Sequence, residues 1–255
     1  MQLYLAVAPT EIREASRFTR SFAHVAYRIG PESTLLRRDL LLETRGGLLS
    51  VSDRDAPAVD QPEKLAAAVE RECGRRSYTG AVLDFESLPT PDRRTFAAIL
   101  TARLLRSRRS VFLPESYGEI PGAVALINTA VSGGTYQERL QEALARCGRA
   151  ALDVQRLSMD FPLPAQSGEG LPLTREQLQK LIDAQTPSVF FSKELCARYF
   201  TYSLGGTAHF VLYDDAETLL QKLRTGSSMG FCAAFFMYPE VTDLLEKLFF
   251  KPGRG

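Results

Sequence analysis

Residues 80–89 read GAVLDFESLP, an apolar run that ends in two acids. Side chains alternate along a β-strand, so one face of this run would carry both acids and the other would be wholly apolar. The first face would consist of Gly80, Val82, Asp84 and Glu86, and the second of Ala81, Leu83 and Phe85. We predict a buried strand whose apolar face packs on helices and whose acids stand at its open end.

Predicted strands alternate with predicted helices on both sides of this stretch. Eight short runs rich in β-branched or aromatic residues are each followed by a segment with helical spacing. The strand candidates begin at residues 3, 22, 46, 80, 110, 153, 188 and 230, and the helix candidates cover residues 10–22, 31–45, 61–76, 90–108, 135–149, 174–185, 215–226 and 238–250. Repeated strand–helix units predict a parallel sheet. Closure into a (β/α)₈ TIM barrel would leave no open edge, and a doubly wound open sheet is the alternative.

Two segments do not fit a minimal barrel. Residues 117–134, after the fifth strand candidate, are too long for an ordinary βα loop and apolar enough to be packed. Residues 196–215, near the seventh strand candidate, predict an antiparallel hairpin that turns at Gly205 and Gly206. Since the sequence contains no internal repeat or linker, we predict one barrel domain over residues 1–255.

Composition narrows the class of protein. Apolar residues make up 45% and charged residues 24%, which is typical of a globular chain and excludes intrinsic disorder. The net charge of +1 offers no bulk attraction to nucleic acid or to an anionic membrane, so we expect neither partner. The first residues lack the basic region of a signal peptide, and we expect a cytoplasmic location. Four scattered cysteines and two histidines predict neither a metal site nor another cofactor.

The candidate binding residues are those at the carboxyl ends of the predicted strands, where barrels place their sites. This rim is rich in acids and tyrosines, which suits a neutral polar ligand such as a sugar better than a phosphate. Its candidate ligand contacts are Tyr27, Ser52, Glu115, Asp160 and Tyr238.

The pair formed by Asp84 and Glu86 is the strongest candidate for chemistry. Two carboxylates about 7 Å apart along one strand repel each other's ionisation, so one tends to keep its proton. A protonated carboxyl beside an ionised one is equipped for general-acid cleavage of an acetal. The alternative is structural: both acids could cap a helix or pair with arginines such as Arg93.

At this point the sequence resembles a known family. Residues 80–100, GAVLDFESLPTPDRRTFAAIL, resemble the fourth strand and helix of glycoside hydrolase family 18, the chitinase-like barrels. They look closest to the spore-cortex-lytic and YaaH-type N-acetylglucosaminidases. The family motif DxxDxDxE would fall on Thr79, Val82, Asp84 and Glu86, so its last Asp and its Glu match and its first two acids do not.

Three further segments are similar to family blocks. Residues 48–53, LLSVSD, stand where the family has an SxGG third strand. Residues 156–162, RLSMDFP, stand where it has an MxYD sixth strand, which would put Phe161, a further candidate substrate contact, in place of the tyrosine. A shift of one residue would instead put Asp160 in the pocket. Residues 209–223, HFVLYDDAETLLQKL, resemble the seventh strand and helix, where YDD…S…K is common.

The resemblance implies a substrate-assisted, retaining hydrolysis of N-acetylglucosamine-containing glycans, either chitooligosaccharide or peptidoglycan. Glu86 would be the general acid/base, and Asp84 would orient the 2-acetamido group that attacks the anomeric carbon. The chain has no tryptophan, so Phe235, Phe236 or Tyr238 would have to replace the family's sugar-stacking tryptophan. A glycan in a sporulating cell would fit a protein without an export signal.

Two other functions stay open. Loss of the acid at Val82 and of the tyrosine at Phe161 would suit a barrel that binds glycans, or has a structural role, without turnover. An unrelated barrel enzyme acting on a phosphorylated metabolite is the third hypothesis, which the lack of a phosphate-binding loop disfavours.

Overall fold

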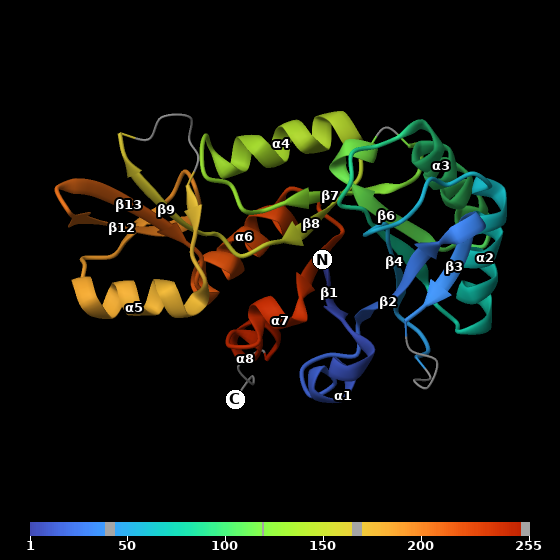
Figure 1. The fold of residues 1–255 in the computed structure, drawn as a ribbon, viewed down its shortest axis with the longest axis horizontal. Helices are drawn as coiled ribbons and strands as arrows, with labels where there is room; N and C mark the ends of the chain where they lie inside the picture. The colour runs from blue at the N-terminus through green and yellow to red at the C-terminus, as the bar shows by residue number, and fades with distance from the viewer. Residues whose placement is uncertain (39–43, 119, 165–169, 251–255) are drawn as a thin grey trace.

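The computed structural model describes residues 1–38, 44–118, 120–164 and 170–250 and is built on a closed barrel of parallel strands (Figure 1). In chain order the barrel strands are β1 (Gln2–Val7), β2 (Phe22–Gly30), β4 (Leu48–Ser52), β5 (Gly80–Asp84), β6 (Ser110–Pro114), β7 (Val124–Asn128), β8 (Ala150–Val154) and β14 (Ala233–Met237). Each strand pairs with the next, and β1 pairs with both β2 and β14, which closes the ring. The barrel prediction is therefore confirmed, and the open sheet is excluded.

Aromatic rings fill the inside of the barrel. The ring of Phe235 stacks on that of Tyr4 at 5.0 Å between centroids and meets that of Phe112 edge-on at 4.9 Å. Val82 and Leu48 belong to the same buried cluster. The inward face of residues 80–84 is thus apolar below the level of Asp84, as the alternation along the strand requires.

Helices cover the outside of the ring in two groups. On one side lie α2 (Pro62–Arg75) and α3 (Pro91–Arg106), whose Leu65, Val69 and Leu100 are fully buried against the strands. The other side is covered by α4 (Tyr136–Cys147), α6 (Ala216–Ser228), α7 (Tyr238–Val241) and α8 (Leu245–Phe249), with the short α1 (Ile12–Ala15) beside them. None of the described helices combines the length and the apolar character that crossing a bilayer requires.

The prediction of a helix over residues 31–45 is wrong for residues 31–38 and 44–45, which are the part of this segment that the structure describes. After a single 3₁₀ turn, η2 (Pro31–Ser33), the chain forms strand β3 (Thr34–Arg37), which runs antiparallel to β2. Glu32 and Ser33 have φ angles of 53° and 54°, in the left-handed region, and this stops a right-handed helix before it starts. Residues 39–43 of the expected helix lie outside the described residues.

The apolar segment at residues 117–134 is packed, as expected, because it contains the sixth barrel strand, β7. Between β6 and β7 the chain forms only the 3₁₀ turn η3 (Glu115–Tyr117) and no α-helix, so the alternation of strand and helix is interrupted here. The next barrel strand, β8, is therefore the seventh. The assignment of residues 156–162 to the sixth barrel strand is wrong, since they run into β9 (Ser158–Leu163) of a separate sheet.

That second sheet is an antiparallel insertion between β8 and α6. Its strand order is β10 (Leu171–Pro172), β9, β13 (Thr207–Tyr213), β12 (Ala197–Leu204) and β11 (Phe190–Ser192). Helix α5 (Arg175–Gln185) packs on one face, and the whole unit stands to the left of the barrel in Figure 1. The predicted hairpin at Gly205 and Gly206 is confirmed: it joins β12 to β13, and both glycines have positive φ, 57° and 83°.

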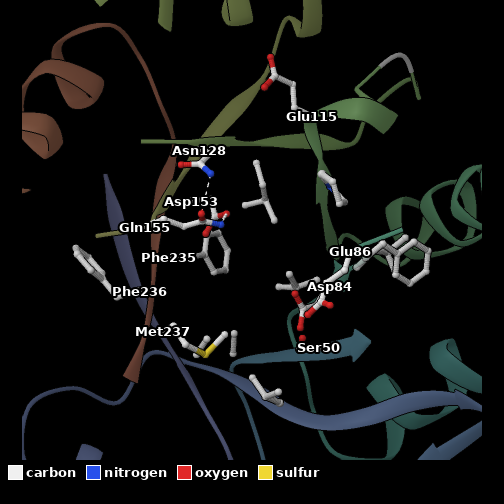
Figure 2. A pocket seen from close by; sticks show the side chains of 18 of the residues that line it. Ser50, Asp84, Glu86, Glu115, Asn128, Asp153, Gln155, Phe235, Phe236 and Met237 are labelled. Carbon is white, nitrogen blue, oxygen red and sulfur yellow. Dashed lines mark hydrogen bonds between the residues drawn. The ribbon is translucent and has the colours of Figure 1, made fainter. Parts of the chain in front are cut away.

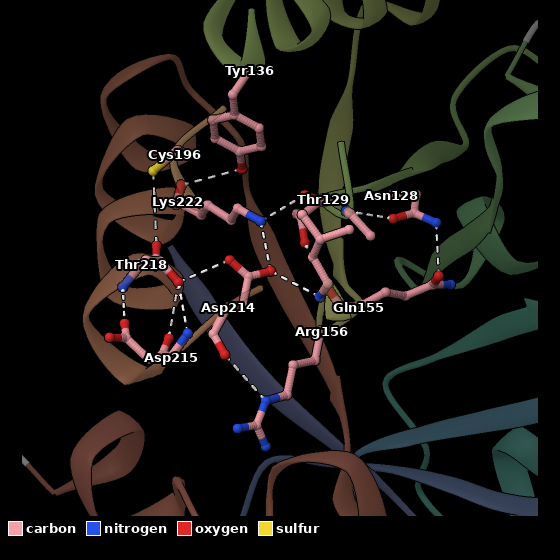
Figure 3. A network of polar contacts seen from close by, with 12 residues as sticks. Asn128, Thr129, Tyr136, Gln155, Arg156, Cys196, Asp214, Asp215, Thr218 and Lys222 are labelled. Atoms are coloured by element: carbon pink, nitrogen blue, oxygen red, sulfur yellow. Dashed lines mark hydrogen bonds and ion pairs between the residues drawn. The ribbon is translucent and has the colours of Figure 1, made fainter. Parts of the chain in front are cut away.

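A buried ion pair fastens this insertion to the barrel (Figure 3). Asp214 lies between β13 and α6, where the chain returns from the inserted sheet to the barrel. Its carboxylate accepts hydrogen bonds from the Leu157 backbone N–H at 2.9 Å and from Lys222 Nζ at 2.7 Å. Lys222 Nζ also donates to the carbonyl of Thr129, just beyond β7, at 2.9 Å. Both charged side chains are fully buried. Asp215 caps α6 by accepting from Thr218 N–H, so the YDD…K pattern has a structural basis.

Lys222→Met should lower the free energy of unfolding by about 3–5 kcal/mol, because it leaves the buried Asp214 charge without its partner. Urea denaturation measures this change. Lys180→Met, on the exposed face of α5, is the matched control and should change stability by less than about 0.5 kcal/mol. Equal stability of the two variants would contradict the role given to this ion pair.

Candidate functional site

The central cavity lies at the carboxyl ends of the barrel strands and has a volume of about 420 Å³ (Figure 2). All eight barrel strands, or the residues just after them, contribute to its wall. Val82 and Phe235 form an apolar floor, and acids and amides stand nearer the opening. A concave apolar site with a few converging polar groups is the common form of a small-molecule site.

Asp84 and Glu86 lie side by side in this cavity (Figure 2). Asp84 is the last residue of β5 and is partly buried, whereas Glu86 follows the strand and is exposed. Burial raises the pKa of Asp84 to about 6, with further contributions from the nearby Glu86 and Asp53 charges. Near neutral pH a fraction of Asp84 therefore keeps its proton beside Glu86, which is the arrangement that acid–base chemistry requires.

Asp53, just after β4, fixes the loop that carries Glu86. Its side chain is 1% exposed, and its Oδ1 accepts the Glu86 backbone N–H at 2.9 Å. Its Oδ2 accepts the Ser87 hydroxyl and lies 3.5 Å from Arg93 Nε. Arg93 thus pairs with Asp53, and within the described ranges neither Asp84 nor Glu86 takes part in an ion pair. The structural alternative for the two acids does not hold at Arg93.

The sequence did not point to a set of three polar residues in this cavity that are hydrogen-bonded to one another. Asp153, near the end of β8, accepts a hydrogen bond from Gln155 Nε2 at 2.9 Å, and Asn128 at the end of β7 donates to Gln155 Oε1 at 2.7 Å. Burial raises the pKa of Asp153 to about 6, opposed by the Gln155 hydrogen bond and reinforced by the charges of Asp84 and Glu240. The period-2 pattern of Val124, Leu126 and Asn128 could have identified β7 and its polar end.

A second cavity, of about 460 Å³, adjoins the central one and shares Asp84 and Glu86 with it. The predicted residue Ser52 lines it, together with Arg28, Arg38 and Arg54. We call it the arginine-lined cavity. The two cavities share four wall residues, Val25, Asp84, Glu86 and Met237, so the acid pair borders both.

Tyr27 and Tyr238 border the barrel mouth but turn their hydroxyls away from it. A bulge in β2 between Val25 and Tyr27 reverses the alternation, so the Tyr27 hydroxyl donates to Glu72 of α2 at 2.8 Å. Tyr238 is the first residue of α7, is buried, and donates to Glu14 at 3.2 Å.

The remaining predicted residues are held by other contacts. Glu115 borders the central cavity, but its carboxylate is paired with Arg139 and Arg146 of α4. Asp160 and Phe161 lie on β9 of the inserted sheet, because that strand is not in the barrel. Asp160 accepts the Tyr202 hydroxyl at 2.8 Å and lies 3.1 Å from His209 Nδ1, and Phe161 packs against Phe210. The structure therefore brings Asp84, Glu86, Ser52 and Glu115 to the two cavities. Tyr27 also lines the arginine-lined cavity, although its hydroxyl points away to Glu72, whereas Tyr238, Asp160 and Phe161 line neither cavity.

The described part of the chain holds no cluster of three or more His, Cys, Asp or Glu side chains suited to a metal ion. The chemistry that its central cavity can perform with its own side chains is proton transfer by carboxyls. Asn128 and Gln155 add amide donors and acceptors at the same opening.

Comparison with known proteins supports the fold. No family model and no curated protein sequence matches the chain. The chitinase from Chromobacterium violaceum has a similar structure, with a TM-score of 0.69, 13% identity, and coverage of 97% of this chain and 98% of that one. The Bacillus cereus spore cortex-lytic enzyme SleL gives 0.66 and 15%, covering 100% of this chain and 75% of that one. A class V chitinase mutant from Cycas revoluta in complex with (GlcNAc)₃ gives 0.66 and 12%, with 97% and 98% covered. The resemblance to family 18 is supported at the level of the fold.

Asp84→Asn should make the protein more stable above about pH 7, by about 1–3 kcal/mol. The carboxyl has a pKa of about 6 in the folded chain against an ordinary value of 3.8, so the folded state holds a proton that the unfolded state has lost. Its contribution to stability therefore falls as the pH rises from about 4 to about 6, and the asparagine removes this loss. Urea denaturation at a series of pH values measures the difference in free energy of unfolding between Asp84→Asn and the unmodified protein, and this difference should disappear toward pH 4. A difference that does not depend on pH, or one equally large for the exposed control Asp55→Asn, would contradict the burial of this carboxyl.

Asp53→Ala should lower the free energy of unfolding by about 2–4 kcal/mol, because Arg93 loses its ion-pair partner and two donors of the Glu86 loop lose their acceptor. The measurement is chemical denaturation, with the exposed Asp60→Ala as the matched control. A loss no larger than that of the control would show that Asp53 does not hold this loop.

Proposed function

We propose that this protein is a glycoside hydrolase of the family 18 type that cleaves N-acetylglucosamine-containing glycans. The observation that carries the proposal is the acid pair: a partly buried carboxyl with a raised pKa, Asp84, beside the exposed Glu86 at the mouth of a closed barrel. Fold similarity to chitinases and to a spore cortex-lytic enzyme supports the same class. One of the similar chitinases binds (GlcNAc)₃, which supports a glycan as the ligand.

The reaction would be substrate-assisted. Glu86 donates its proton to the glycosidic oxygen while the carbonyl oxygen of the substrate's 2-acetamido group bonds to the anomeric carbon and the C–O bond to the leaving sugar breaks. Glu86, now a carboxylate, then takes a proton from water as that water attacks the anomeric carbon and reopens the cyclic intermediate. Two inversions at one carbon retain its configuration. Exposure of Glu86 suits both steps, since the leaving sugar and the water must each reach it.

Asp84 would act on the acetamido group. Once the proton that Asp84 keeps near neutral pH has passed to Glu86, the ionised Asp84 accepts the acetamido N–H, turns the carbonyl toward the anomeric carbon, and stabilises the positive charge that develops on nitrogen. In family 18 an acid two residues earlier shares a proton with this aspartate, but Val82 stands there. We infer that Asp153 supplies the second carboxyl from across the barrel. It faces the same cavity, and its pKa responds to the charge of Asp84.

Asn128 and Phe235 would complete the sugar site. Asn128, at the end of the sixth barrel strand, offers an amide donor for the acetamido oxygen, a role that the family gives to a tyrosine hydroxyl. Phe235 presents an aromatic ring at the cavity floor, on which the apolar face of a sugar can stack.

A second function is favoured by specific observations. Val82 removes the inner acid of the family motif, and Asn128 replaces a hydroxyl with an amide, so a barrel that binds glycans without cleaving them is the competing candidate. Hydrolysis and binding must therefore be measured on the same preparation.

Glu86→Gln should reduce the release of a chromophore from an N-acetylglucosaminide by about 10²–10⁴-fold, the usual contribution of a general acid. The fold should be intact, since Glu86 is exposed and its backbone N–H bond to Asp53 is kept. Glu63→Gln, an exposed residue in the first turn of α2, is the matched control and should keep full activity.

Unchanged turnover in Glu86→Gln would remove the general-acid assignment. If the unmodified protein releases no chromophore but binds chitotriose by calorimetry, the binding function replaces hydrolysis. If it does neither, both candidates fail.

A further inference from the structure

The arginine-lined cavity is a built recess beside the acid pair. Its basic side chains come from three segments of the chain: Arg28 from β2, Arg38 from the residues after β3, and Arg54 from the residues after β4. The acidic groups that face the same space are Asp55, Asp84 and Glu86. No step of the proposed hydrolysis uses the arginines.

Local backbone geometry places these arginines together. The bulge in β2 turns Tyr27 outward, and Arg28, which pairs in register with Ser52 of β4, takes the side that faces the cavity. The antiparallel return of β3 along β2 brings Arg38 back to the same rim, where its N–H donates to the Ala26 carbonyl at 2.7 Å. Arg54 follows Ser52 in a turn, with its N–H donating to the Ser52 hydroxyl at 3.2 Å.

The N–H donors of these three guanidinium groups are available to a ligand. Among the residues that the structure describes, none of them is within 4.0 Å of a carboxylate, whereas other arginines around the barrel mouth, such as Arg93 and Arg139, are paired. A guanidinium group presents a planar fork of donors that matches a carboxylate or phosphate. The site is therefore suited to an anion.

The charges of the cavity favour a singly charged anion. Asp55, Glu86 and the ionised fraction of Asp84 repel negative charge, so a dianionic phosphate is opposed more strongly than a carboxylate. A wholly neutral glycan would offer these arginines no anionic group, and the described residues place no carboxylate within 4.0 Å of them either. Because the cavity shares Asp84 and Glu86 with the central one, its ligand belongs to the sugar next to the bond that is cleaved.

We propose that the arginine-lined cavity binds the carboxylate of an acidic sugar adjacent to the N-acetylglucosamine unit, so that the protein prefers acidic to neutral glycans. The proposal rests on the proposed function, since it takes the acid pair as the point of cleavage. It selects a substrate class that the central cavity, with its apolar floor and amides, does not distinguish.

The test compares three ligands by calorimetric titration at low salt. They are the disaccharide of N-acetylglucosamine and N-acetylmuramic acid, the methyl ester of that disaccharide, and chitobiose. The chain carries Glu86→Gln so that no ligand is cleaved. The acidic disaccharide should bind about tenfold more tightly than its ester, and this preference should shrink in about 0.5 M salt, where exposed charges are screened.

Arginine variants locate the effect. Arg28→Gln and Arg54→Gln should each weaken binding of the acid about threefold to tenfold and leave the ester and chitobiose unchanged. Arg28→Lys, which keeps the charge but loses the fork, should lie between. Arg71→Gln, an exposed arginine of α2 that lines neither cavity, is the matched control and should change nothing. Since Arg28 and Arg54 are exposed, the variants should fold, which circular dichroism checks.

Equal binding of acid and ester, unaffected by the arginine variants, would overturn the subsite and leave the proposed hydrolysis standing. Failure of acid, ester and chitobiose alike to bind would overturn the proposed function and the subsite with it.

Discussion

Pairing of β1 with both β2 and β14 closes the sheet, and everything at the candidate site follows from that closure. In a closed ring of parallel strands, all carboxyl ends open on one side, so residues far apart in sequence meet there. Asp84, Asn128 and Asp153 reach one cavity because β5, β7 and β8 end at the same level. The aromatic cluster inside the ring sets the depth of that cavity, with Phe235 shared between the core and the floor.

Because the strand ends meet at one cavity, their arrangement also determines the electrostatics of the cavity opening. Carboxyls from different strands are placed near one another in a poorly solvated recess, and the pKa values of Asp84 and Asp153 are both raised, with burial as the largest cause. One acid has a different environment: Asp53 accepts hydrogen bonds from a backbone N–H and a hydroxyl, forms an ion pair with Arg93, and acts as a structural anchor. Acids that hold the loop and acids that can exchange protons are thus distinguished by their hydrogen-bond partners, and not by their distance from the strand ends.

The sequence allowed the barrel, the acid pair and the inserted hairpin to be predicted, because each has a local signal: period-2 alternation, two acids two residues apart, and a Gly-Gly turn. The sixth strand was missed because only a 3₁₀ turn separates it from the fifth, so Asn128 was not assigned to a strand end. Asp153 was placed at the start of a strand when it lies near the end of one. The outward turn of Tyr27 depends on a β-bulge, which has no signal in the residues around it. Residues 209–223 were predicted to form a barrel strand and its helix. The strand belongs to the inserted sheet instead, and the motif contains the buried pair of Asp214 and Lys222.

The most direct test of substrate-assisted cleavage at this acid pair is the configuration of the sugar first released from a β-linked N-acetylglucosamine oligosaccharide, followed by proton NMR before mutarotation. Attack by the acetamido group and then by water predicts the β-anomer as the initial product. Initial release of the α-anomer would mean direct attack by water and would contradict the mechanism. A complete lack of released sugar would contradict the hydrolytic function itself.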